Sequence, residues 1–136
     1  MDVLSSRVIL QPTDLLRSQG FYRDTLGLAV YRQFGDPDAP GVVFHVGNGL
    51  LEVSGHTSEP ANHNTALWMQ VRDVYAEHRR LLDAGVTILR EPVQEPWGLV
   101  ELWIADPDGV RIVLVEIPDD HPLRRDQRDP SDPGTT

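Results

Sequence analysis

The sequence predicts an α+β domain made of two copies of a βαβββ unit. The order strand, helix, strand, strand, strand can be read twice along the chain. The residues that begin and end the two predicted helices are also spaced alike. Asp14 and Asp73, the expected helix caps, lie 59 residues apart, and the expected helix stops, Gly27 and Gly85, lie 58 apart. This matched spacing indicates an internal duplication.

The first unit spans about residues 5–55. Its first strand is the apolar run RVILQPTD, which ends in a turn. The segment DLLRSQGFYRDTLGL has apolar side chains at roughly helical spacing, so it predicts a helix that stops at Gly27. AVYRQFG is a second strand, and the turn residues DPDAPG form a loop. VVFHVGNGLLEVSG predicts a hairpin that turns at Gly47-Asn48-Gly49.

The second unit spans about residues 64–117. It begins with the strand ALWMQVRD, followed by a helix in DVYAEHRRLLDAG. One face of this helix is expected to carry Val74, His78, Leu81 and Leu82. VTILREP is a strand, VQEPWG a loop, and residues 99–117 a final hairpin that turns at Asp-Pro-Asp-Gly. The folded domain is expected to cover residues 1–118, and the polar, proline-rich segment 119–136 is a predicted disordered tail.

Composition excludes several classes of protein. The net charge of −9 argues against nucleic acid as a partner, because its phosphates would be repelled. The absence of cysteine excludes disulfides, thiolate metal sites and cysteine nucleophiles. There is no apolar run near the length of a membrane span and no signal-peptide pattern at the start, so we expect no membrane partner and a cytoplasmic location.

Two sequence elements identify a related family. DLLRSQGFYRDTLGL in the first unit and PWGLVELWIADPDG in the second resemble the vicinal oxygen chelate superfamily. That superfamily includes glyoxalase I, extradiol dioxygenases, fosfomycin resistance enzymes and bleomycin resistance proteins. The resemblance covers residues 5–117 and implies a glyoxalase-like fold, in which the two modules curl a mixed sheet around one pocket.

The resemblance also implies where a metal would bind, on the first and last strand of each unit. The corresponding residues here are Arg7, Glu52, Ala66 and Val113, of which only Glu52 is a metal donor. Glu116 is near Val113, but side chains alternate along a strand, so we expect Glu116 on the opposite face, exposed at the strand end. We therefore predict no cofactor.

An alternative metal site would recruit His45 beside Glu52. These two donors fall short of the three or four protein ligands that a tight divalent site requires. Glu52 is also a weak candidate for a general base, and no other catalytic residue is predicted. A divalent metal held by Glu52 and His45 remains the alternative prediction.

Strand alternation predicts which side chains face the pocket. The resulting candidates for ligand binding are Arg7, Gln11, His45, Glu52, Trp68, Gln70, Glu101, Trp103 and Arg111, with apolar walls from Ile9, Leu50, Val113 and Val115. Trp68 and Trp103 are expected either to sandwich a flat ligand or simply to fill the barrel. Arg7 and Glu52 are expected to pair, and Trp97 to anchor the loop before the final hairpin.

The function predicted from these observations is binding rather than catalysis. The chain resembles the bleomycin resistance branch, in which three of the four metal donors can be lost, and this resemblance implies a homodimer that sequesters a small aromatic or cationic compound. The alternative is a divalent-metal-dependent lyase, isomerase or dioxygenase of the same superfamily. It would require a different alignment of the metal positions or the recruitment of His45.

Overall fold

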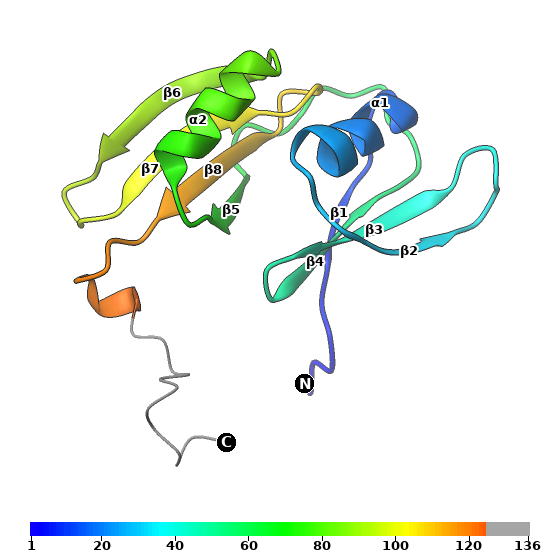
Figure 1. The fold of residues 1–136 in the computed structure, drawn as a ribbon. Helices are drawn as coiled ribbons and strands as arrows, with labels where there is room; N and C mark the ends of the chain where they lie inside the picture. The colour runs from blue at the N-terminus through cyan, green and yellow to red at the C-terminus, as the bar shows by residue number, and fades with distance from the viewer. Residues whose placement is uncertain (125–136) are drawn as a thin grey trace.

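Two four-stranded sheets, each with its own helix, make up the computed structural model, which describes residues 1–124 of the 136-residue chain (Figure 1). The first module contains β1 (Val8–Leu10), α1 (Leu15–Gly20), the π-helical turn η1 (Phe21–Thr25), β2 (Val30–Phe34), β3 (Gly41–Val46) and β4 (Gly49–Val53). The second contains β5 (Ala66–Gln70), α2 (Val74–Asp83), β6 (Thr87–Gln94), β7 (Val100–Ala105) and β8 (Arg111–Glu116). The two strand orders, β1-β4-β3-β2 and β5-β8-β7-β6, are equivalent, which confirms that the βαβββ unit occurs twice.

The helices begin at the predicted caps. The Asp14 carboxylate accepts the N–H of Arg17 at 3.1 Å, and the Asp73 carboxylate accepts the N–H of Ala76 at 3.0 Å. Gly27 and Gly85 follow the helical segments with φ of 79° and 77°, values that favour glycine. The sequence did not predict that the first helix would widen into a π-helical turn.

Two predicted details are wrong. β6 continues to Gln94, so Val93 and Gln94 belong to a strand rather than a loop. The β6–β7 pairing is irregular on both sides of Arg90, and such bulges cannot be recognised from side-chain alternation.

The predicted apolar face of α2 is wrong at one residue: Leu82 is 50% exposed, whereas Leu81 is buried. Consecutive helical residues point about 100° apart, so only one of these two leucines faces the sheet.

One hydrophobic core joins both modules. In each sheet, alternate residues of the two central strands pack toward the helices: Val42, Phe44, Leu51 and Val53 in the first module, and Val100, Leu102, Ile104, Ile112 and Leu114 in the second. The helical residues Tyr22, Val74 and Leu81 complete this core. The other face of the second sheet carries a smaller cluster of Leu99, Val113, Val115 and Ile117, with Trp103 packed against it. We call the sheet faces turned away from the helices the concave faces.

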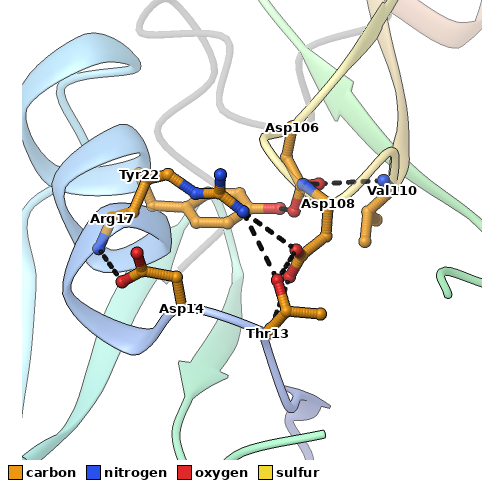
Figure 2. Close-up of polar contacts among 7 residues, drawn as sticks. All are labelled: Thr13, Asp14, Arg17, Tyr22, Asp106, Asp108 and Val110. Carbon is orange, nitrogen blue, oxygen red and sulfur yellow. Dashed lines mark hydrogen bonds and ion pairs between the residues drawn. The ribbon is translucent and has the colours of Figure 1, made fainter. Parts of the chain in front are cut away.

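A buried polar contact ties the modules together (Figure 2). The Tyr22 hydroxyl donates to the Asp106 carboxylate at 2.7 Å. Asp106 also accepts the backbone N–H groups of Asp108 at 2.9 Å and Val110 at 2.8 Å, which fixes the β7–β8 turn. Burial raises the pKa of Asp106, and it also raises that of Tyr22 beyond its usual range, with the neighbouring carboxylate adding to the effect. Within residues 1–124 no strand of one sheet pairs with a strand of the other, so this junction is made by side chains.

The chain continues beyond β8 into the segment predicted to be a tail. Residues 119–124 contain a turn and the short 3-10 helix η2 (Pro122–Arg124). The His121 ring lies 2.9 Å from the carbonyl oxygen of Trp97 and accepts the N–H of Leu123. The prediction of disorder for residues 125–136 lies outside the described residues. Among the described helices, none has the length and apolar character needed to span a bilayer.

Candidate functional site

Strand pairing shows which predicted side chains lie on the concave faces. In the first sheet, Val43 pairs with Glu52 and His45 with Leu50, while their neighbours Phe44 and Leu51 belong to the core. In the second sheet, the rows that pair Glu101 with Val115 and Trp103 with Val113 alternate with core rows. The side chains available to a ligand are therefore on the sheet faces opposite the helices.

The four positions at which the fold family would hold a metal do not suit one here. The Arg7 guanidinium lies 3.1 Å from Glu52 Oε1, so a cationic side chain already pairs with the one carboxylate of the set. The second oxygen of Glu52 accepts the Ser54 hydroxyl at 2.7 Å. Ala66 and Val113 offer no donor atom. Within residues 1–124 no group of three or more His, Cys, Asp and Glu side chains is placed to hold a metal ion.

His45 has a neighbour other than Glu52. Its ring stacks edge-on against Tyr31, with 5.0 Å between ring centroids. His45 pairs with Leu50, and Glu52 pairs with Val43, so the histidine and the carboxylate are two residues out of register on adjacent strands. The alternative metal pair therefore has two donors on one sheet and no third beside them in the described part of the chain.

Glu116 points away from the concave face, as alternation predicted, but it is not an exposed strand-end residue. It is half-buried, and its carboxylate accepts the N–H of Val74, the first residue of α2, at 3.0 Å. A carboxylate at a helix N-terminus satisfies a free backbone donor and complements the helix dipole. Glu116 thus anchors α2 to β8, which explains why it is unavailable as a shifted metal ligand.

Three strands place the two tryptophans in one row. Trp68 on β5 pairs with Val113 on β8, which pairs with Trp103 on β7. Because neighbouring strands are about 4.8 Å apart, the two tryptophan backbones are separated by roughly 10 Å. Trp68 is 52% exposed, whereas Trp103 packs against the smaller cluster and carries the Arg111 guanidinium over its ring at 4.7 Å. The two indoles therefore belong to one face of the sheet, with Val113 on the strand between them.

A cleft of about 340 Å³ opens beside Trp103 on the concave face of the second module. Its lining is Leu89, Arg90, Glu95, Trp97, Glu101, Trp103 and Arg111, all from one module. Glu101 is buried; it accepts the indole N–H of Trp97 at 3.1 Å and lies 4.0 Å from Arg90, which also pairs with Glu95. The size is at the lower end of the range for small-molecule pockets.

The structure gathers only some of the predicted ligand-binding residues. Glu101, Trp103 and Arg111 line this cleft, and Trp68 lies in the same row of the sheet. Glu52 and His45 are on the first sheet, Arg7 lies just before β1, and Gln70 is exposed at the end of β5. Gln11 lies beyond β1 and lines a different cavity, between the modules.

Sequence reasoning missed four residues of the cleft: Leu89, Arg90, Glu95 and Trp97. Trp97 was expected to anchor a loop; it does contact Glu101, but it is also 58% exposed at the cleft. The irregular pairing of β6 turns Leu89 and Arg90 toward the cleft, and a bulge leaves no mark in the alternation pattern. A cluster of charged and aromatic residues between positions 89 and 103 was the available signal.

Comparisons with known proteins agree with the two-module fold. The family model described as "Glyoxalase/Bleomycin resistance protein/Dioxygenase superfamily" matches residues 5–114. A superfamily member from Sphaerobacter thermophilus DSM 20745 is 26% identical, with a TM-score of 0.64 over 85% of this chain and 97% of that one. TioX from Micromonospora sp. ML1 is 23% identical, with a TM-score of 0.68 over 82% and 94% of the two chains.

A third solved structure is similar in fold: TnmS3, an antibiotic binding protein from Streptomyces sp. CB03234. It is 20% identical, with a TM-score of 0.71 over 86% of this chain and 98% of that one. The search of curated proteins gave no match. Since the family model matches most of the chain, the protein belongs to the Glyoxalase/Bleomycin resistance protein/Dioxygenase superfamily.

Proposed function

We propose that this protein binds and sequesters a small aromatic compound on its concave faces, without a metal. The observation that carries the proposal is the row formed by Trp68, Val113 and Trp103, which presents two indoles across an apolar strand. Stacking on indoles binds planar groups without a reacting residue. The fold similarity to TnmS3 and TioX adds support, because TnmS3 is described as an antibiotic binding protein.

An aromatic ligand fits better than a cationic one. Arg111 lies at the cleft and makes no ion pair among the described residues, so it would repel a cation. The carboxylates nearby, Glu95 and Glu101, are already engaged by Arg90 and Trp97. Arg111 covers one face of the Trp103 ring, so the ligand would stack on the other face and on Trp68.

A second copy of the chain would complete the binding site. The cleft is lined by one module only, and apolar side chains on or beside the concave faces are left exposed: Ile9 is 55% exposed, Trp68 52% and Leu89 48%. A soluble protein rarely leaves such a surface uncovered unless it binds something. We infer a homodimer in which the first sheet of one copy, with Arg7 and Glu52, lies opposite the tryptophan row of the other.

The experiment is a ligand screen by tryptophan fluorescence with planar aromatic compounds. We expect quenching by at least one scaffold class, and Trp68→Ala and Trp103→Ala should each weaken the affinity at least tenfold. Leu82→Ala, on the exposed face of α2, is the matched control and should leave the affinity unchanged. Light scattering at several protein concentrations measures the molar mass in solution, and the homodimer predicts twice the mass of one chain. Binding that survives both tryptophan substitutions would refute the site.

A metal titration separates binding from the alternative activity. Protein purified without chelator is assayed for bound metal, and its thermal stability is followed with Zn²⁺, Ni²⁺, Mn²⁺ and Fe²⁺ in turn. Binding without a metal predicts no stoichiometric metal and no stabilisation. One equivalent of metal, lost in Glu52→Ala and His45→Ala, would instead support a metal-dependent lyase, isomerase or dioxygenase.

A further inference from the structure

Arg111 brings an unneutralised positive charge to the cleft on the second concave face. The other guanidinium of the lining, that of Arg90, pairs with Glu95 and lies 4.0 Å from Glu101. Arg111 makes no ion pair with any residue from 1 to 124. Its guanidinium donates to the carbonyl oxygen of His63 at 3.3 Å. Since a guanidinium has five N–H donors, most of those of Arg111 have no acceptor among the described residues.

The strand register leaves the guanidinium of Arg111 accessible. Its cross-strand partners are Ala66 on β5 and Ala105 on β7, whose methyl groups are too short to cover it. The Arg111 side chain is half-buried, and it lines both the cleft of about 340 Å³ beside Trp103 and a neighbouring cleft of about 500 Å³. Leu89 also lines both clefts, so the two adjoin at these residues. A ligand can therefore reach the N–H groups of Arg111 from solvent.

The row of Trp68, Val113 and Trp103 lies next to this charge. Arg111 precedes Val113 by two residues on β8, so both side chains are on the same face of the sheet. A strand rises about 3.3 Å per residue, which places these two side chains roughly 7 Å apart. The guanidinium also lies 4.7 Å from the centre of the Trp103 ring. A short polar substituent on a ring stacked in this row would therefore meet the N–H groups of Arg111.

We propose that the ligand of this site is an aromatic carboxylate, whose oxygens accept hydrogen bonds from Arg111 while its ring stacks in the tryptophan row. This step rests on the proposed sequestration of an aromatic compound and specifies the charge of that compound. A guanidinium and a carboxylate pair through two parallel N–H···O bonds, and such charged hydrogen bonds are stronger than neutral ones. The net charge of −9 opposes a ligand with several negative charges, so we expect a single acid group.

The experiment measures the affinity of the full chain for 2-naphthoate and for 2-naphthamide, the neutral compound of the same shape, by calorimetry at pH 7. Naphthoate is expected to bind roughly tenfold more tightly or better. Arg111→Met removes the charge and keeps an apolar side chain that can pack against the Trp103 ring. It should lower the naphthoate affinity to that of naphthamide and leave naphthamide binding unchanged. Raising the salt concentration should weaken the binding of naphthoate alone.

Two further variants separate the role of Arg111 from a general effect of charge or folding. Arg79→Met makes the same change of charge on the exposed side of α2, so it is the matched control and should bind both probes as the parent does. Arg111→Lys keeps the charge but loses the paired donors, so its naphthoate affinity should fall between those of the parent and of Arg111→Met. Thermal midpoints equal to that of the parent show that each variant is folded.

Equal affinity of the parent for the two probes, or naphthoate binding that Arg111→Met leaves unchanged, would overturn the proposal. If such charge-independent binding is lost in Trp68→Ala, the aromatic site still stands and only the acid group is refuted. If neither probe binds at millimolar concentration, the aromatic carboxylate is refuted. The fluorescence screen with other aromatic scaffolds then decides the proposed function separately.

Discussion

Tyr22→Phe removes one hydroxyl from the junction between the modules and preserves the packing of the ring. The side chain is fully buried, and its hydroxyl lies 2.7 Å from the Asp106 carboxylate. A hydrogen bond to a charged group contributes about 1.5–3 kcal/mol. Because Asp106 keeps two backbone donors, we expect a loss near the middle of that range, about 2 kcal/mol. For a domain of this size that corresponds to roughly 8 °C in the thermal midpoint.

The pH dependence of this loss is the sharper test. The folded-state pKa of Asp106 is raised above its unfolded value, so the stability that its proton contributes is complete below pH ~3.9 and is lost as the pH rises through the folded pKa. The Tyr22 hydroxyl favours the carboxylate and limits that rise. Phenylalanine raises the pKa further, so the variant should lose more stability at pH 7 than at pH 4.

Stability at alkaline pH gives an independent test of the Tyr22–Asp106 contact. The pKa of Tyr22 is itself raised in the folded state. The stability that its phenolic proton contributes is therefore complete below pH ~10 and is lost as the pH rises further. The parent should therefore weaken above pH 10 in a way that Tyr22→Phe does not. Urea unfolding, followed by tryptophan fluorescence at a fixed protein concentration, measures each case. Tyr75→Phe, on the exposed side of α2, is the control and should change stability by less than about 0.5 kcal/mol. An equal loss at pH 4 and pH 7 would refute the reasoning about Asp106.

Three further substitutions test the fold. Glu116→Ala should lower the free energy of unfolding by about 1 kcal/mol, because the N–H of Val74 loses its acceptor, and Glu116→Gln should lower it by less. Equal losses for the two variants in urea unfolding would contradict this. Gly41→Ala should destabilise by more than about 1 kcal/mol, since its new methyl group would clash with the ring of Phe34; a midpoint unchanged in thermal unfolding would show that the ring moves freely. Arg7→Met should cost less than about 1 kcal/mol, and raising the salt concentration should shrink the difference, because the ion pair is partly exposed; a loss that salt leaves intact would mean that packing dominates.

The sequence predicts the features that depend on local chemistry. Asp14 and Asp73 cap their helices because a short carboxylate side chain reaches the N–H of the residue three positions later. This contact lies within four consecutive residues, so the local sequence is enough to predict it. Alternation correctly placed Glu116 away from the concave face, but it gave no information on the helix terminus that the carboxylate meets. A carboxylate at a strand end looks the same whether water or a helix lies beside it.

Contacts between distant residues could not be inferred from local sequence alone. Tyr22 and Asp106 are 84 positions apart, and nothing in either local sequence specifies the other. The cleft lining was also missed where β6 departs from regular pairing, because a bulge changes which side a residue faces without changing the residue. The pairing of Arg7 with Glu52 was predicted and is confirmed, because the family alignment placed both residues on neighbouring strands.

The absence of any strand pairing between the two described sheets has a consequence for synthesis on the ribosome. All four strands of the first sheet are complete once Val53 has emerged, so its hydrogen-bonded ladder can close while the second half of the chain is still being made. The partner of Tyr22, however, is Asp106, which emerges much later. During that interval the nascent first module exposes Tyr22 and the helix surface that will later be buried. We expect chaperones to bind the chain most readily at this stage.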